Sequence, residues 1–329
     1  PGPASYGHGG TEPTVTDAYL TCGFLNPDNF IGGSMKLHPD RAQAAIGEIA
    51  GKLGFSTEDA ADAVIRITTS NMSTHLLPLL TKRGIDPRDF SLIAYGGAGA
   101  THACFLADEV NIPRIIVPPS PGTLCALGAA VADLKSDHIR TFRRPLSDVN
   151  DSEIADAFGV LEKAGSDWLE RQGSKVEATE VRRSADVRYR GQAFDIEVQL
   201  GDSDKNAAGV TRQFHQTYET LYKRSDPNQP AELINLRLRM IGKVPKPALP
   251  ELPASDGGQA PEPVSSRPVY LGGGWCEASV FDRATLRPGQ CIPGPAIIEQ
   301  FDTTTVVAPD YSAEVNAHGL LILTKKVIV

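Results

Sequence analysis

A glycine-rich turn carries the clearest chemical signature in this sequence. Residues 91–95 predict a short apolar strand, and residues 101–110 predict a helix. Gly96, Gly97, Ala98 and Gly99 lie between them. Glycines at such a turn let a ligand approach the backbone, and the N–H groups of a helix start attract an anion. The turn is therefore a candidate nucleotide-binding element. Because it matches neither G-x-G-x-x-G nor the P-loop, a tight turn that merely packs a helix on a sheet remains the alternative.

His102 follows this turn by three residues, on the first turn of the predicted helix. An imidazole there can contact a bound ligand or carry a proton. The alternative is a capping histidine or a buried one whose hydrogen bonds are satisfied. The other histidines and the five cysteines are dispersed, without the spacing of metal ligands. We therefore predict no metal site built by this chain alone, and cysteines that stay reduced in the cytoplasm.

The N-terminal segment Gly9 to Asp17 is polar, dense in hydroxyl groups and hinged by glycine. Glu12, Thr14 and Asp17 are candidate cleft residues, because a carboxylate there could serve Mg²⁺ or act as a general base. The alternative is a structural turn in which Asp17 or Thr16 caps a following helix. Residues 302–305, Asp-Thr-Thr-Thr, are likewise either functional or structural, and the structural alternative is that they begin a strand.

The elements that must position these residues alternate between helix and strand over residues 1–140. A helix is predicted from Pro39 to Leu53, and a second from Ser56 to about residue 83, with a kink or break near Pro78. A strand is predicted at 114–117, followed by a helix of small residues through 132. This alternation predicts an α/β domain with a parallel sheet.

The pattern of helix and strand signals differs in the rest of the chain. Residues 141–244 predict an α+β domain with helices at 150–171 and 210–222, a hairpin at 186–200 and a strand at 233–241. Residues 245–268 are rich in proline and predict a linker. Residues 269–329 predict a small β-rich C-terminal domain, because short strand signals alternate with Gly and Pro turns.

Composition limits the partners of the chain. Its 329 residues carry 32 Lys and Arg against 40 Asp and Glu, a net charge of −8, which argues against nucleic acid or an anionic membrane as partner. No apolar run approaches the length of a transmembrane helix. The sequence begins inside a Pro- and Gly-rich segment without a methionine, so we expect a piece of a longer protein.

Five spaced segments resemble the hydantoinase A / 5-oxoprolinase family, which includes the ATP-binding subunits of acetone and acetophenone carboxylases. The similarity covers the whole chain in order. The matching segments are 1–18, 30–35, 83–90, 95–103 with its Tyr-Gly-Gly-Ala-Gly, and 294–307 with its Gly-Pro-Ala-Ile-Ile-Glu and Thr-Thr-Thr-Val-Val.

The resemblance implies the second half of an actin/sugar-kinase-like nucleotide-binding domain at 1–140. By similarity, Gly96 to Gly99 form the adenosine-side loop of a site for ATP and Mg²⁺. The D-x-G-G-T phosphate loops of such folds are absent from this chain, so the resemblance places them upstream or on another chain. The implied partners are the N-terminal half of the same subunit and a hydantoinase B-type subunit.

The implied reaction is ATP-dependent phosphorylation and opening of a cyclic amide of the hydantoin or 5-oxoproline type. Two alternatives stay open: part of a ketone carboxylase subunit, and a non-catalytic assembly or nucleotide-sensing module. No residue is assigned a catalytic role. The segment Leu76 to Leu80 lacks an arginine common in the family and contains Pro78, which favours a divergent, carboxylase-like branch.

Overall fold

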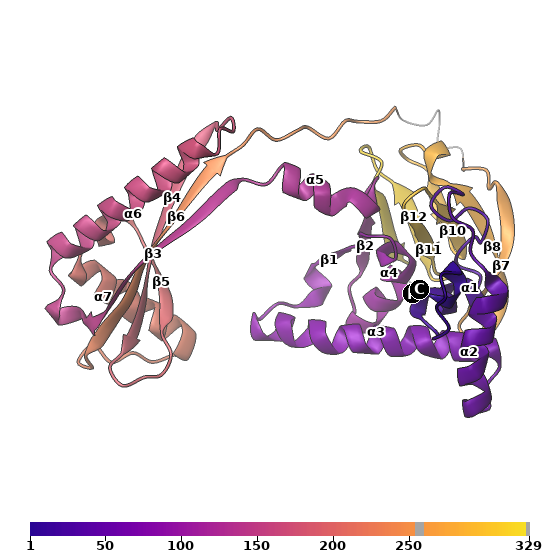
Figure 1. Cartoon of the computed structure of the whole chain (residues 1–329), viewed down its shortest axis with the longest axis horizontal. Helices are drawn as coiled ribbons and strands as arrows, with labels where there is room; N and C mark the ends of the chain where they lie inside the picture. Colours follow the sequence, from indigo (N-terminus) through magenta and orange to yellow (C-terminus); the bar gives the residue numbers. More distant parts are fainter. Residues whose placement is uncertain (254–259, 327–329) are drawn as a thin grey trace. The chain divides into compact units, whose positions relative to one another are not determined.

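The computed structural model describes residues 1–253 and 260–326 (Figure 1). The chain divides into two compact units. Unit 1 combines residues 1–127 with the described residues from 249 onward, and unit 2 comprises residues 128–248. Residues 254–259 of the predicted linker lie outside the described residues, and the described linker residues before 265 form neither helix nor strand.

Two helices of unit 1 have ends that local signals predict. Pro39 opens one of them, and Gly54, with a φ of +71°, ends it. The side chain of Ser56 caps the next helix by accepting a hydrogen bond from Asp59 N. The α-helices are α1 Val15–Thr21, α2 Pro39–Leu53, α3 Thr57–Lys82, α4 Gly99–Val110 and α5 Leu124–Ala130, which crosses the boundary between the units.

The break predicted near Pro78 does not occur, because α3 continues through this residue to Lys82. Proline removes one backbone donor, which leaves the carbonyl of Thr74 without its helical partner. Thr74 is exposed, so water can reach that carbonyl. The helix therefore tolerates proline at a place where the lost hydrogen bond is replaced by solvent.

Two sheets complete unit 1. The first has the order β1-β2-β13-β12-β9, and the second has the order β11-β10-β8-β7. The strands of the first are β1 Ser91–Ile93, β2 Arg114–Val117, β9 Cys291–Pro293, β12 Tyr311–Val315 and β13 Leu321–Lys325. Those of the second are β7 Ser265–Leu271, β8 Gly274–Asp282, β10 Ala296–Glu299 and β11 Thr304–Val307.

The structure confirms the prediction of an α/β chain with several helices and strands. The sheet that contains β1 and β2, however, is not all parallel. β1 and β2 are parallel, whereas β13 runs antiparallel to β2. The predicted β-rich domain at 269–329 does form strands. Its strands nevertheless share a sheet with β2, and its apolar side chains share one core with α4, so this segment belongs to unit 1. Small residues of α4, such as Ala100, Ala103 and Ala107, let the helix pack closely against strands of both segments.

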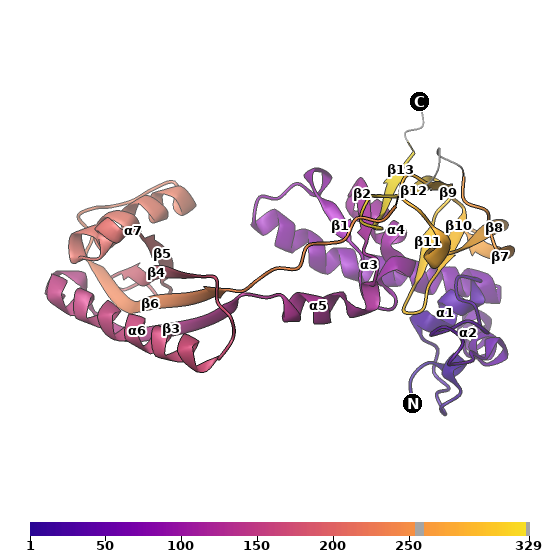
Figure 2. The ribbon, with the colours of Figure 1, turned by 90° about the horizontal axis from the view of Figure 1, so that it is seen from above.

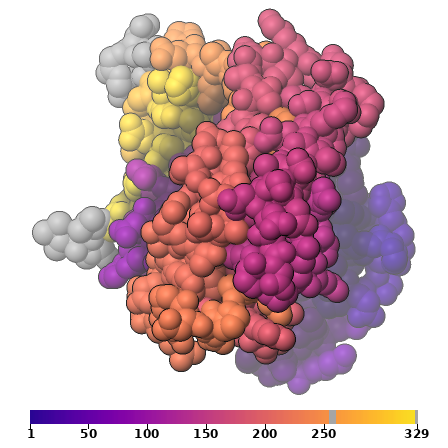
Figure 3. Space-filling model, turned by 90° about the vertical axis from the view of Figure 1, so that its left-hand side faces the viewer, coloured from indigo at the N-terminus to yellow at the C-terminus, as the bar shows by residue number. Residues whose placement is uncertain are grey.

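Unit 2 is a four-stranded antiparallel sheet of order β3-β6-β4-β5. Figure 2 shows α6 lying along its strands, and Figure 3 shows the surface of the unit as a space-filling view. The elements are β3 Leu134–Pro145, α6 Asp151–Arg171, β4 Ala178–Tyr189, β5 Ile196–Leu200, α7 Ala207–Tyr222 and β6 Ala231–Lys243. The predicted helices, hairpin and last strand are therefore present. Their ends are shifted by no more than three residues, except that β4 begins at Ala178 and not at the predicted residue 186.

Strand β3 was not predicted, and the predicted domain boundary at 140 falls inside it. Its charged residues, including Lys135, Asp137 and Arg140, hide the alternation typical of a half-buried strand. Lys135 and Asp137 lie on the polar face of the sheet, where Arg239 donates to Asp137 at 2.7 Å. Arg140 is instead paired with Leu236, a residue of the core-facing side. The other face packs on both helices through one apolar core.

The two segments by which the chain enters and leaves unit 2 are bonded to each other. Asp133 precedes β3 and accepts hydrogen bonds from Lys243 Nζ at 3.1 Å and Lys246 Nζ at 2.7 Å. These hydrogen bonds lower the pKa of the Asp133 carboxyl below its usual range. Unit 2 is thus an insertion whose two ends are tied side by side.

Short 3₁₀ helices connect several elements: η1 Ala4–Tyr6, η2 Pro87–Asp89, η3 Pro121–Thr123, η4 Leu146–Asp148, η5 Asp202–Asp204 and η6 Arg283–Thr285. Within the described residues, no helix has the length and apolar character needed to cross a membrane.

Candidate functional site

The Gly96–Gly99 turn lies between β1 and α4, as predicted, and is held by residues distant in the sequence. The hydroxyl of Thr303 donates to the carbonyl of Gly97 at 2.8 Å. The hydroxyl of Thr101 donates to the carbonyl of Thr304 at 2.7 Å. Gly96 has a φ of +82°, which glycine adopts without strain. The C-terminal segment therefore fixes the shape of the turn.

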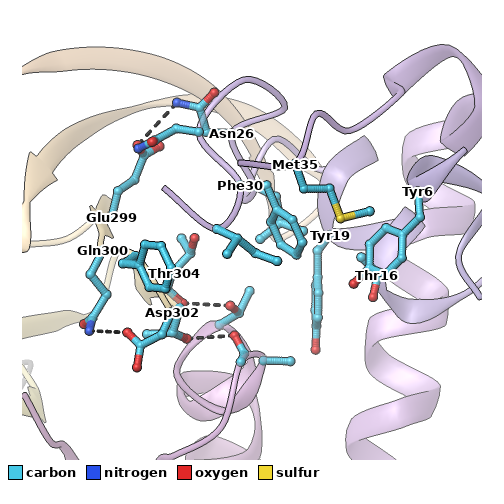
Figure 4. Close-up of a pocket in the computed structure, with 18 residues that line it drawn as sticks. Tyr6, Thr16, Tyr19, Asn26, Phe30, Met35, Glu299, Gln300, Asp302 and Thr304 are labelled. Atoms are coloured by element: carbon cyan, nitrogen blue, oxygen red, sulfur yellow. Dashed lines mark hydrogen bonds between the residues drawn. The ribbon is translucent and has the colours of Figure 1, made fainter. Parts of the chain in front are cut away.

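Two cavities border this turn, and both are built entirely within unit 1. We call the first, of about 300 Å³, the polar cavity (Figure 4). It is lined by Tyr6, Thr16, Tyr19, Leu25, Asn26, Asn29, Phe30, Ile31, Met35, Gly97, Ala98, Thr101 and residues 299–304. We call the second, of about 340 Å³, the apolar cavity. It is lined by Tyr19, Met72, Leu92, Ile93, Ala94, Tyr95, Ala98, Gly99, His102, Ala103 and Leu106.

Carboxylates and amides line one side of the polar cavity. Glu299 accepts hydrogen bonds from the side chains of Asn26 at 3.3 Å and Asn29 at 2.9 Å, and its other oxygen pairs with Arg267 at 3.0 Å. Asp302 accepts from Gly122 N at 2.7 Å. Both carboxylates are therefore held in place by the protein around them.

His102 is buried, and its two ring nitrogens have distinct partners. The hydroxyl of Thr69 donates to the carbonyl of Ile65 at 2.9 Å, so its oxygen is free to accept from His102 Nε2 at 3.0 Å. This leaves Nδ1 as the acceptor for the hydroxyl of Tyr19, 2.6 Å away. Burial lowers the pKa of His102 below its ordinary value. His102 is thus a neutral bridge between α1, α3 and α4.

The lowered pKa of His102 makes the stability of unit 1 depend on pH. The unfolded histidine, with a pKa of about 6.5, takes up a proton before the folded one does. The contribution of the neutral imidazole to stability is complete above that pKa and is lost as the pH falls below it. We expect the urea concentration at the unfolding midpoint of unit 1 to decrease as the pH is lowered from about 7.5 to about 5.5. The variant His102→Gln, which can donate and accept without titrating, should show a smaller decrease. An equal decrease in both proteins would contradict this assignment.

The three N-terminal candidates lie apart from the cavity lining. Glu12 is exposed, and neither it nor Thr14 nor Asp17 lines the polar or the apolar cavity. Thr14 caps α1, and Asp17 closes the capping box. Asp17 is fully buried and also accepts from Ala4 N and Ser5 N. In this structure the carboxylate of Asp17 holds the segment around η1 against α1.

Sequence reasoning missed most of the polar cavity. Thr16 was considered only as a cap, and residues 302–305 only as a strand entry. Glu299 and Thr303 to Val307 belong to the segments that carry the family resemblance, which was the available signal. The pattern alone could not place them beside Gly97, because residues more than 200 positions apart in sequence meet there. Within the described residues, no three or more His, Cys, Asp or Glu side chains lie close enough together to hold a metal ion.

The sequence and the fold both match one family. Residues 1–138 match the family described as hydantoinase/oxoprolinase, and residues 147–326 match the hydantoinase/oxoprolinase C-terminal domain. The chain belongs to the hydantoinase/oxoprolinase family. This confirms the resemblance noted from the sequence.

Its relatives include proteins of assigned activity. The caprolactamase subunit alpha of Pseudomonas jessenii is 33% identical over 98% of this chain and 48% of its own length. The acetone carboxylase beta subunit of Xanthobacter autotrophicus is 29% identical over 93% and 45%. An uncharacterized protein of Methanocaldococcus jannaschii is 36% identical over 98% and 46%. The chain spans about half the length of these curated relatives.

Two solved structures have a similar fold. The crystal structure of the ATP-dependent caprolactamase from Pseudomonas jessenii matches 99% of this chain and 48% of its own, with a TM-score of 0.81 and 33% identity. A nucleotide-free structure of acetone carboxylase matches 98% and 48%, with a TM-score of 0.79 and 28% identity.

Proposed function

We propose that this chain supplies the adenosine side of an ATP site in an enzyme subunit that phosphorylates and opens a cyclic amide. The observation that carries the proposal is the glycine turn at the carboxyl end of β1, bordered by a cavity on each side. Ligands of α/β sheets bind outside the carboxyl ends of strands, where backbone N–H groups of the next helix are available.

The apolar cavity suits the nucleobase. Its lining comes mainly from β1, from α4 and from the residues between them, and α1 and α3 each add one side chain, Tyr19 and Met72. It contains flat or small apolar groups such as Tyr95, Ala98 and Ala103. The proposal also includes the actin-like arrangement, in which the phosphate-binding half belongs to sequence outside this chain. Mg²⁺ would then be held largely by the phosphates of ATP, as is common for this ion.

The chemistry that ATP supplies is activation of a poor electrophile. The amide oxygen attacks the γ-phosphorus, ADP leaves, and the phosphorylated amide carbon becomes open to water. Water then adds to this carbon, and the C–N bond of the ring breaks to leave an amine and an acyl phosphate. A second water hydrolyses the acyl phosphate and releases phosphate and the carboxylate. A cyclic amide is favoured over a ketone because the caprolactamase subunit is more similar to this chain than the acetone carboxylase subunit is. We propose that a hydantoinase B-type subunit completes the ring opening.

The variant Gly97→Val tests the nucleotide assignment. A β-carbon at Gly97 would lie 3.8 Å from the nearest heavy atom, the carbonyl oxygen of Asp302, so the fold has room for it. A β-branched side chain would instead obstruct a ligand at the turn. We expect ATP binding to the complete enzyme to weaken at least about tenfold, measured by calorimetry. The control is Gly51→Val on α2, where an added β-carbon meets nothing within 4 Å. Unchanged binding in Gly97→Val would contradict the assignment.

The reaction class is tested by the substrate that stimulates ATP hydrolysis in the complete enzyme. Stimulation by a lactam or hydantoin supports the proposal. Stimulation by bicarbonate with a ketone would instead support a carboxylase, and nucleotide binding without stimulation by either would support a non-catalytic module.

A further inference from the structure

Strand register divides the side chains of the five-stranded sheet into rows that alternate between its two faces. One row faces the apolar core that includes α4, and it comprises Leu92, Ile115 and Leu323. The adjacent row, which we call the isoleucine row, points to the opposite face and comprises Ile93, Ile116 and Ile322. Ile93 is 53% exposed, and the other two isoleucines are half-buried. This face of the sheet is therefore apolar and open to solvent.

The apolar character of this face is confined to the side of β1. Beyond the isoleucine row, Glu314 of β12 pairs with Ile322, and Cys291 of β9 pairs with Glu314. β1, which carries Ile93, lies at the edge of the sheet. Exposed apolar side chains on an edge strand favour contact with another segment of protein. The open apolar surface thus lies where a further body of structure can pack.

Helix α5 follows β2 through η3 and has no polar face. Residues 121–132, which include α5, contain no charged side chain. Every residue of α5 after Leu124 is exposed, among them Cys125 and Leu127. A surface helix normally presents a polar face to water, and a helix that is apolar all round is normally buried. The sequence of α5 therefore indicates that another body of structure covers it.

The length of the relatives indicates what this body is. This chain spans 48% of the caprolactamase subunit alpha and 48% of the chain in the caprolactamase crystal structure. The match to the C-terminal domain of the family extends to residue 326, so we expect the unmatched half of such a relative to precede the matched half. Domains of one chain bury about 600–1,500 Å² against each other, which is enough to cover the isoleucine row and α5.

We propose that the isoleucine row and α5 form the interface with the sequence that precedes this chain in the complete subunit. The proposal rests on the part of the proposed function that places a further half of the subunit upstream, and it names the surface on which that half packs. Ile93 also lines the apolar cavity. The interface therefore adjoins the proposed site of the nucleobase.

The two exposed cysteines of unit 1 provide the first test. Cys125 lies on α5, whereas Cys291 lies on β9, beyond the isoleucine row. The full-length subunit, without other subunits, is alkylated with iodoacetamide, and mass spectrometry gives the rate at each thiol relative to its rate in the unfolded protein. We expect Cys125 to react at least about tenfold more slowly than Cys291, because alkylation of a covered thiol requires local opening. Equal relative rates would overturn the proposal.

A photo-reactive side chain identifies the covering body. Leu127 is 46% exposed, so p-benzoylphenylalanine can replace it without disturbing the core. After irradiation of the full-length subunit, we expect cross-links to peptides that precede Pro1 in the same polypeptide. Cross-links to a second copy of the subunit, to a partner subunit or to unit 2 would contradict the proposal.

A charged substitution tests whether one body covers both surfaces. Ile322→Lys places an ammonium group opposite Glu314, so the sheet itself can accommodate it. Burial of this charge at the interface is costly, and we expect the alkylation rate of Cys125 in the full-length subunit to rise at least about threefold. An unchanged rate of Cys291 shows that the sheet is intact. The control is Ile67→Lys on α3, where Ile67 is 62% exposed and lies outside the row. Equal Cys125 rates in both variants would show that the row and α5 are not covered together.

The outcomes separate this proposal from the proposed function. Protection of Cys125 by the preceding sequence, in a subunit that binds no ATP, supports the interface and contradicts the proposed function. ATP binding that depends on Gly97, in a subunit whose Cys125 is freely alkylated, supports the proposed function and overturns the interface.

Discussion

Replacing Asp17 with alanine is expected to lower the free energy of unfolding of unit 1 by about 3–4 kcal/mol. The side chain is fully buried. Its carboxylate accepts hydrogen bonds from Ser5 N at 2.8 Å, Ala4 N at 3.2 Å and Thr14 N at 2.9 Å, and from the hydroxyl of Thr14 at 2.8 Å. Alanine leaves several of these donors buried without an acceptor, and each such loss costs about 1–3 kcal/mol.

The measurement is urea denaturation followed by a probe of unit 1, with Glu12→Ala as the matched control. Glu12 is exposed and near in sequence, so its loss should change stability by less than about 0.5 kcal/mol. Asp17→Asn keeps one acceptor oxygen and should fall between the two. An Asp17→Ala variant as stable as Glu12→Ala, but unable to bind nucleotide, would instead support the sequence-based hypothesis of a cleft carboxylate.

Replacing Phe214 with alanine is expected to destabilise unit 2 by about 3–5 kcal/mol. Phe214 lies on α7 and has no exposed surface. Its ring packs against Tyr189 of β4, with ring centroids 4.8 Å apart, and against Tyr218 of the same helix, 5.6 Å apart. Truncation therefore removes buried apolar area and opens a cavity that these rigid rings cannot readily fill.

This loss should be confined to unit 2, because its apolar core consists only of residues of that unit. Calorimetry should show one thermal transition moving down while ATP binding by the complete enzyme is retained. The control is Phe194→Ala, since Phe194 is 51% exposed and its loss should have little effect. A single transition that moves as a whole in Phe214→Ala would show that the two units unfold together.

Local signals predicted the helices well. Pro39 and Gly54 mark the ends of α2, and Ser56 with Asp59 marks the start of α3, because capping depends on residues only a few positions apart. The turn at Gly96 to Gly99 was predicted for the same reason, since a strand, glycines and a helix follow one another directly.

Contacts between distant segments could not be predicted from the pattern. Nothing local to Leu321 or Val117 shows that these residues pair between β13 and β2. The hydrogen bond from Thr303 to Gly97 likewise joins residues more than 200 positions apart in the sequence. The site was therefore half predicted: its glycine turn is a local feature, whereas its carboxylates and amides arrive through tertiary structure.

The insertion of unit 2 within unit 1 has a consequence for synthesis of the protein. All strands of unit 2 emerge from the ribosome before β13, so unit 2 can complete its core while unit 1 still lacks strands. During that interval the apolar residues of α4 and β2, such as Ala107, Ile115 and Val117, have no C-terminal strands to cover them. The polar cavity at the glycine turn forms only when residues 299–304 arrive, so a ligand of that cavity would stabilise the last step of folding.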